Sequence, residues 1–98
     1  MSWASRYILQ LRTEEYVEFR PRGTSMEPIV KDNQLVRVQA VRDGTKIEVG
    51  DVVLCVVGGR QYLHLVKAIN GDRYLIGNNR GGLNGWTNRK NVHGVRVA

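Results

Sequence analysis

Three side chains of this chain have the types and the surroundings that nucleophilic catalysis requires. Ser25 lies in the turn-like segment 23–28, which reads GTSMEP, and His64 and Lys67 follow in one apolar segment. A serine hydroxyl becomes an effective nucleophile when a neighbouring base takes its proton. Histidine is the usual base, and burial can lower the pKa of a lysine toward the same role. The sequence therefore predicts a Ser-His or a Ser-Lys dyad.

The spacing of the two candidate bases limits which of them can reach the serine. Residues 61–69 have the composition of a β-strand, and successive side chains of a strand point to opposite faces. His64 and Lys67 are three residues apart, so they lie on opposite faces of a regular strand. Only one of them can contact Ser25, unless the strand contains a bulge.

The order of the motifs resembles that of LexA-type repressor proteases and type I signal peptidases. In that superfamily a Gly-x-Ser-Met-x-Pro segment is followed by two Gly-Asp turns, a strand with the base, and a Gly-Asp-Asn segment. The matching positions here are residues 31–33 before a strand at 34–38, Gly50-Asp51 before 52–57, residues 62–68, and 77–79. The resemblance extends over roughly residues 19–97. It implies a mainly β domain, a bent antiparallel β barrel or sandwich, with Ser25 as the nucleophile.

The same resemblance implies which residue is the base. Repressor proteases and bacterial signal peptidases use lysine, whereas archaeal and endoplasmic-reticulum signal peptidases use histidine in a His-Arg-Val-like segment. Residues 63–67, which read LHLVK, are more similar to the histidine branch. We therefore expect His64 to be the base and Lys67 to be the alternative base if the strand bulges.

A histidine base needs a third group that orients its ring, and in the histidine branch this group is an aspartate near the Gly-Asp-Asn segment. Asn78 stands at that position here, and Asn84, six residues later, is also neutral. An asparagine can orient an imidazole but does not offset the charge of the imidazolium. Replacement of the triad aspartate by asparagine in a serine protease costs about 10⁴ in turnover. We expect Asn78 to orient the base weakly, and catalysis to be slow.

Residues beside the serine are the candidates for substrate contact. Gly23 allows a close approach of the substrate, Thr24 offers a hydroxyl group, and Met26 would line a subsite. The backbone N–H of Ser25 is the predicted donor to the oxyanion. A peptide or protein is thus the expected substrate, with no cofactor and no metal ion.

The charge of the chain supports an alternative function. The formal net charge is +6, and from Arg80 to the last residue there is no acidic side chain. Such a surface attracts phosphate groups and acidic proteins, although it is also compatible with a merely solvated basic face. The alternative is a weakly active or inactive protease-like binding module for nucleic acid or an acidic protein. Its predicted contact residues are Arg80, Trp86, Arg89, Lys90 and Arg96.

The pattern of apolar residues predicts a single domain with one helix and about seven strands. Residues 1–15 are expected to form a leader with a short helix over 5–15, and residues 16–98 the β domain. Strands are expected at 16–21, 34–40, 49–57, 61–69, 73–76 and 92–97.

Several sequence features indicate the cellular setting. Cys55 is the single cysteine and lies in an apolar strand, which is typical of a buried thiol and of a reducing cytoplasm. No signal peptide is recognisable, and the longest apolar run is too short to cross a bilayer. A free-standing domain of this kind resembles small phage-encoded relatives of the family, and the sequence allows a homodimer.

Overall fold

The computed structural model describes residues 2–98, which form one seven-stranded antiparallel sheet with a single short α-helix. The strand order is β1-β2-β7-β3-β4-β5-β6. The predicted mainly β class is therefore confirmed. The elements are α1 (Ser5–Gln10), β1 (Tyr16–Phe19), β2 (Val36–Ala40), β3 (Val52–Val57), β4 (Arg60–Asn70), β5 (Arg73–Gly77), β6 (Leu83–Asn88), the 3₁₀ turn η1 (Arg89–Asn91) and β7 (Val92–Val97).

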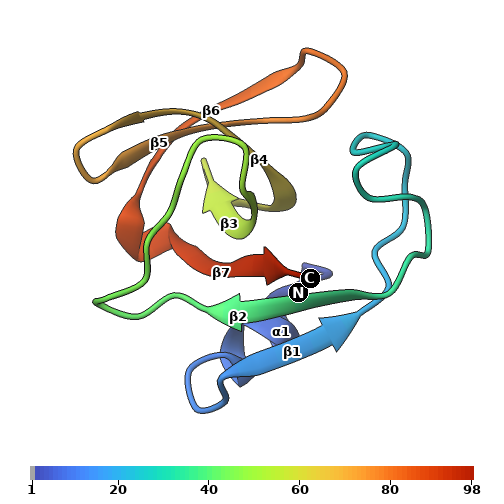
Figure 1. Ribbon diagram of the computed structural model, residues 1–98, viewed down its shortest axis with the longest axis horizontal. Helices are drawn as coiled ribbons and strands as arrows, with labels where there is room; N and C mark the ends of the chain where they lie inside the picture. The colour runs from blue at the N-terminus through green and yellow to red at the C-terminus, as the bar shows by residue number, and fades with distance from the viewer. Residues whose placement is uncertain (1) are drawn as a thin grey trace.

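The sheet is strongly curled but open. Figure 1 shows β1, β2 and β7 on one side of β3, and β4, β5 and β6 on the other. Strand β6 comes back over β3 without pairing with it, and the Thr87 hydroxyl donates a hydrogen bond of 2.7 Å to the Val56 carbonyl. In the part of the chain that the structure describes, β1 and β6 do not pair with each other. A closed barrel is therefore not confirmed.

Two groups of buried apolar side chains lie on the two faces of β3. Val52 and Leu54 belong to the group that includes the helix, whereas Val53 and Cys55 belong to the group beneath β5. Strand β3 is thus buried on both faces, as its uninterrupted apolar sequence predicts. Burial raises the pKa of the Cys55 thiol to about 12, so this thiol stays protonated and unreactive.

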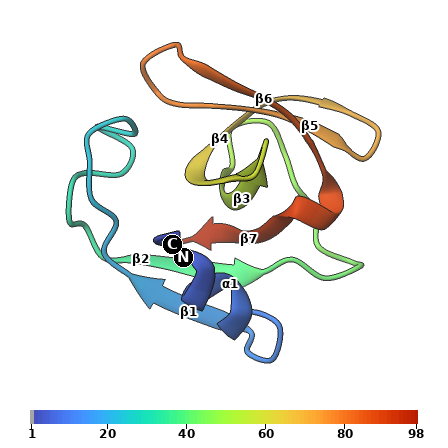
Figure 2. The same cartoon turned by 180° about the vertical axis from the view of Figure 1, so that it is seen from behind.

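The helix is shorter than its expected range of 5–15, and it packs against the sheet. It ends at Gln10, and Ala4, Ile8 and Leu11 are buried against the first apolar group. Figure 2 shows α1 in front of β1 and β2, with the two ends of the chain close together. The chain after the helix leads into β1. The Glu15 carbonyl, just before β1, accepts a hydrogen bond of 2.8 Å from the Ala40 N–H on β2.

Strand β6 is the strand that the sequence did not predict. Its sequence, LNGWTN, contains a glycine and three polar residues, and Thr87 is its only buried side chain. A strand with so weak an alternation is held by its neighbours rather than by its own propensity. In this chain the neighbours are β5, which pairs with it, and β3, which it crosses.

The segment between β1 and β2 carries Ser25 and is closed at its base by two hydrogen bonds. The Asn33 N–H donates to the Pro21 carbonyl at 2.7 Å, and the Arg20 guanidinium donates to the Asn33 carbonyl at 3.0 Å. Asn33 adopts a left-handed conformation with φ of 61°. These contacts close the base of the segment, which stands at the right-hand side of the molecule in Figure 1.

We predict that Gly94→Ala lowers the free energy of unfolding by about 1–3 kcal/mol. A Cβ atom at Gly94 would collide with Val38 and would lie 3.1 Å from Leu11, in the core between β2, β7 and the helix. Gly44→Ala is the matched control, because a Cβ there has no neighbour within 4 Å. Urea denaturation of both variants measures the difference, and equal stabilities would contradict this packing.

Candidate functional site

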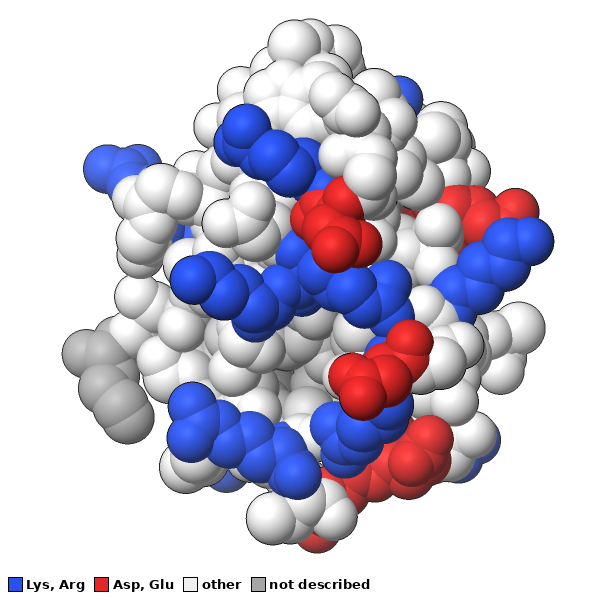
Figure 3. Space-filling model, turned by 90° about the vertical axis from the view of Figure 1, so that its left-hand side faces the viewer, with Lys and Arg blue, Asp and Glu red and all other residues white. Residues whose placement is uncertain are grey.

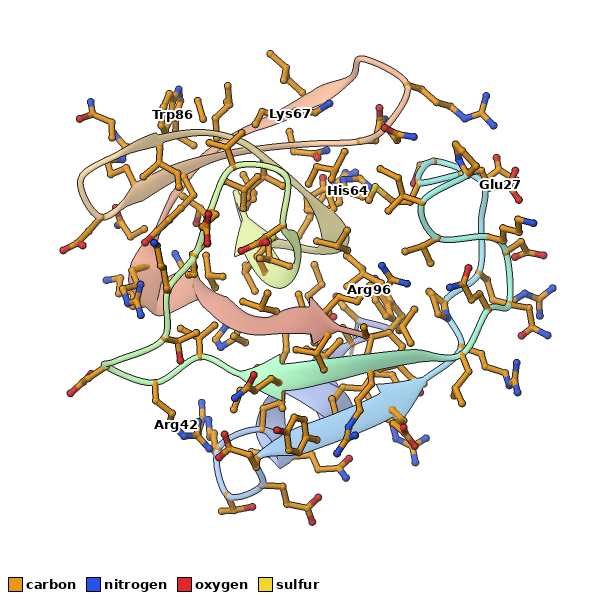
Figure 4. All side chains as sticks on the ribbon, in the orientation of Figure 1. Glu27, Arg42, His64, Lys67, Trp86 and Arg96 are labelled. Atoms are coloured by element: carbon orange, nitrogen blue, oxygen red, sulfur yellow. The ribbon has the colours of Figure 1, made fainter. Side chains whose placement is uncertain are left out.

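The structure brings Ser25 and His64 into contact. The Ser25 hydroxyl lies 3.2 Å from Nε2 of His64, although the two residues are 39 positions apart in the chain. His64 pairs with Val53 in the middle of the sheet and points toward the segment that carries Ser25 and Glu27 (Figure 4). This is the distance at which a base can take a hydroxyl proton.

The other ring nitrogen of His64 contacts Asn84 on β6. Nδ1 of His64 lies 2.7 Å from Oδ1 of Asn84. Because an amide oxygen can only accept, this contact assigns the proton of the neutral ring to Nδ1. Nε2 is then the nitrogen with a free lone pair, and it faces the Ser25 hydroxyl. This is the tautomer that a general base requires.

Asn78, the expected orienting residue, is used elsewhere. Its Oδ1 accepts hydrogen bonds from the N–H groups of Arg80 and Gly82, at 2.8 and 2.9 Å. It therefore stabilises the turn between β5 and β6, and the contact with His64 belongs to Asn84. The β5–β6 hairpin explains the difference, since Leu83 and Leu65 both pair with Gly77. If residues 83–88 had been recognised as a strand that pairs with β5, Asn84 would have been identified as the neighbour of His64.

Strand β4 does contain a bulge, at Lys67, but the serine contacts the histidine. Val66 pairs with Ile76 and Ala68 pairs with Leu75, so the register shifts around Lys67. The Lys67 side chain passes over Gly77, where its Cε would lie 3.1 Å from an added Cβ atom. Figure 4 shows Lys67 separated from His64 along the strand. No hydrogen bond between Lys67 and Ser25 is found in residues 2–98.

The surroundings of His64 favour its neutral form. The imidazole is half-buried, and this burial lowers its pKa below the ordinary value of 6.5, while the hydrogen bond to Asn84 opposes the shift. The ring also stacks against Tyr62, with 4.9 Å between the ring centroids and 29° between the planes. Tyr62 and His64 thus share one face of β4, as the alternation of a strand predicts.

Asn79 and Arg80 hold the nucleophile segment, the turn that carries the candidate nucleophile Ser25, and neither was predicted in this role. The Asn79 N–H donates to the Ser25 carbonyl and its side-chain amide donates to the Glu27 carbonyl, both at 2.9 Å. Nε of Arg80 donates to the Thr24 carbonyl at 3.1 Å. The turn after β5 therefore determines where the Ser25 hydroxyl lies.

The backbone before the serine turns at a glycine with a left-handed conformation. Gly23 has a φ of 113°, a conformation that favours glycine, and its N–H donates to Oδ1 of Asp32 at 2.7 Å. This hydrogen bond, with a smaller contribution from Arg22, lowers the pKa of the exposed Asp32 carboxyl. Within residues 2–98, the Ser25 N–H has no hydrogen-bond acceptor, so it is free to bind an oxyanion.

A cleft of about 370 Å³ extends from the Ser25–His64 pair toward the helix. Gly23 and Met26 line it as expected, whereas Thr24 lies outside the lining. The side chains that form its walls come from the N-terminal segment and the helix, the end of β1, the segment between β1 and β2, and the start of β4. They include an aromatic group, Trp3, Tyr7 and Phe19, and a cationic group, Arg20, Arg22 and Lys31.

The aromatic wall is held by hydrogen bonds between the N-terminal segment and the start of β4. Nε1 of Trp3 donates to the Gln61 carbonyl at 3.3 Å, and Oε1 of Gln61 accepts from the Ala4 N–H at 2.8 Å. The rings of Tyr7 and Phe19 stack with 4.4 Å between their centroids. The end of the cleft away from Ser25 is thus a rigid apolar surface.

The five residues expected to form a basic binding surface do not gather in one place. Arg80 contacts the nucleophile segment, and Trp86 is exposed on β6. Arg89 and Lys90 form most of η1, and Arg96 lies on β7, where it pairs with Val38. Figure 4 shows Trp86 and Arg96 well apart. Only Arg89 and Lys90 are neighbours.

Residues 2–98 contain no cluster of three or more His, Cys, Asp or Glu side chains that could hold a metal ion. No helix among these residues has the length and apolar character needed to traverse a membrane. Comparisons of the chain with protein-family models, curated proteins and solved structures found no match.

We predict that Asn84→Asp raises the pKa of His64, because a carboxylate 2.7 Å from Nδ1 stabilises the imidazolium. An NMR titration of the two histidines measures this shift, and His93 serves as the internal reference. Asn78→Asp is the matched control, since Asn78 binds the turn and not the imidazole. A larger shift of the His64 pKa in the Asn78 variant would show that the orienting residue is misassigned.

Proposed function

We propose that this protein is a serine endopeptidase that cleaves a peptide, or its own chain, with Ser25 as nucleophile and His64 as general base. The main support is a chain of two contacts. The Ser25 hydroxyl lies 3.2 Å from His64, and His64 lies 2.7 Å from Asn84. The resemblance of its motif order to repressor proteases and signal peptidases supports the same reaction. Asn84 is the residue that orients the base.

In the proposed mechanism the Ser25 oxygen attacks the carbonyl carbon of the scissile peptide bond. Nε2 of His64 takes the hydroxyl proton, and the free N–H of Ser25 stabilises the oxyanion of the tetrahedral intermediate. The C–N bond then breaks, and His64 returns the proton to the departing amine. Water, activated by the same imidazole, attacks the acyl-serine ester and releases the carboxylate product.

Because the amide of Asn84 is neutral, formation of the imidazolium is energetically unfavourable in this site. The amide orients the ring through Nδ1 but offers no negative charge, so the turnover is expected to be low. The hydrogen bond to Asn84 and the Tyr62 ring, stacked on His64 at 4.9 Å, compensate in part, because an accepting oxygen and an aromatic face both attract a cation. The site is thus suited to slow or single-turnover cleavage.

The walls of the cleft indicate the class of peptide that it accepts. The aromatic group Trp3, Tyr7 and Phe19 suits a bulky apolar side chain several residues from the cut. The cationic group Arg20, Arg22 and Lys31 suits acidic side chains beside it. We therefore propose an extended substrate that combines apolar and acidic residues.

We predict that Ser25→Ala and His64→Ala each lower kcat/KM by about 10³-fold or more, because each removes a member of the dyad. Lys67→Gln is the matched control and is expected to retain activity, since Lys67 lies over Gly77. The assay combines hydrolysis of a peptide library with mass-spectrometric detection of a fluorophosphonate adduct on Ser25.

Two results would contradict this assignment. If Lys67→Gln abolished labelling while His64→Ala preserved it, lysine would be the base. If the purified chain were neither labelled nor able to cleave any peptide of the library, and Ser25→Ala left its biological effect intact, a binding module would replace the peptidase.

We predict that kcat/KM falls as the pH decreases through an apparent pKa below 6.5. Only the neutral imidazole can accept a proton, and burial keeps His64 neutral to lower pH than an exposed histidine. Asn84→Asp is expected to move this inflection to higher pH and to raise kcat near neutrality. A pH–rate profile of both proteins checks the direction, and an unshifted inflection in the variant would argue against His64 as the titrating base.

A further inference from the structure

A second hollow, of about 430 Å³, shares no lining residue with the cleft beside Ser25. It lies where the end of the helix, the loop after β2, η1 and β7 meet. Its apolar side chains are Ile8, Leu11, Val41 and Val92. Figure 4 shows Arg42, which also lines it, on the opposite side of the molecule from Glu27 in the nucleophile segment. The two sites are thus spatially separate.

Cations dominate the polar lining of this hollow. They are Arg12, Arg42, Arg89 and Lys90, and the remaining polar residues are His93 and one acid, Asp43. In the described part of the chain none of these cations forms an ion pair, since the salt bridge found there joins Arg22 and Asp32. Figure 3 shows this side of the molecule, where Lys and Arg side chains gather with acidic side chains among them. The hollow therefore has an excess of positive charge.

Arg89 is fixed in the wall of the hollow by neutral acceptors. Its Nη2 donates to the carbonyls of Arg42 and Thr45, at 2.9 and 2.6 Å, and its Nη1 donates to the Tyr74 hydroxyl at 3.2 Å. None of these acceptors cancels the charge of the guanidinium. Nη2 of Arg42 in turn donates to the Glu14 carbonyl at 3.3 Å. Two arginines are thus ordered before any ligand binds, which reduces the entropic cost of binding.

The remaining groups of the hollow are suited to a ligand with both a planar and an anionic part. Arg12 and Lys90 are exposed at the rim and are able to reach outward. His93 is half-buried and lines the same hollow, and an imidazole ring is a group on which a planar base can stack. Burial and then the charge of Arg12 lower the pKa of His93, so its ring is neutral near pH 7.

We propose that this hollow binds single-stranded nucleic acid, with one unstacked base over His93 and the apolar floor and the adjacent phosphates on Arg12, Arg42 and Lys90. Arginine and lysine bind phosphodiesters, and a concave site with an apolar floor accepts a base only after it has left a duplex stack. An acidic peptide would satisfy the cations but would leave the floor and the imidazole face unused. The proposal is independent of the peptidase, because no residue is shared.

The test is fluorescence anisotropy with a labelled oligothymidylate of about ten nucleotides. Binding to the full chain should weaken with salt, with a slope of log K on log salt of about −0.7 for each phosphate contacted. The double variant Arg12→Glu/Lys90→Glu should weaken binding by about tenfold or more at low salt. Arg37→Glu/Arg60→Glu is the matched control, because it changes the net charge equally at exposed positions outside both sites.

Two further measurements identify the site. The ring-proton resonances of His93 should move upfield when the oligonucleotide binds, because a base then stacks on the imidazole, and an NMR titration measures this change. The groups that face His93 across the hollow are Arg12, Arg42, Asp43, Arg89 and Lys90. Ser25→Ala should bind the oligonucleotide as the unmodified chain does, even if the peptidase proposal fails.

Several outcomes would overturn the proposal. They are no binding at low salt, binding that does not respond to salt, and equal weakening by the two double variants, which would indicate a response to bulk charge. An oligoglutamate peptide that bound more tightly would assign the hollow to an acidic protein. Thymidine monophosphate that bound as tightly as the oligonucleotide would assign it to a free nucleotide.

Discussion

The hydrogen bond between His64 and Asn84 is the interaction on which the candidate site depends. It assigns the ring proton to Nδ1 and thereby leaves Nε2 to face the Ser25 hydroxyl. The bond exists only because the sheet curls, which brings β6 back across the middle strands. The curled sheet encloses a strand, β3, that is buried on both of its faces. The geometry of the candidate site therefore depends on core packing through the β5–β6 hairpin.

Much of this arrangement follows from alternation in the sequence. The apolar and β-branched segments identify β1, β2, β3, β4, β5 and β7 to within a few residues, and the alternation of β4 separates His64 from Lys67. Strand β6 could not be recognised, because a segment with a glycine and several polar residues lacks that signal. The position of β6 is determined by tertiary contacts, which a local sequence pattern does not contain.

The errors at the site have the same origin. Asn78 and Asn84 are equivalent in a sequence that does not reveal the hairpin between them, and the register with β5 distinguishes them. Likewise, the basic residues after Arg80 form one group in the sequence, whereas in space Arg89 and Lys90 lie with Arg12 and Arg42 from distant elements. The turn around Ser25 was predicted correctly from the sequence, because a turn is a local structure.

Arg89 joins the loop after β2 to η1 through carbonyl and hydroxyl oxygens rather than through carboxylates. An anchor of this kind keeps its full charge while it holds the backbone, and Debye screening weakens it less than an exposed ion pair. A high salt concentration would therefore dissociate an anionic ligand from this side of the molecule while the loop after β2 stayed ordered. Folding and anion release would consequently have separate responses to ionic strength.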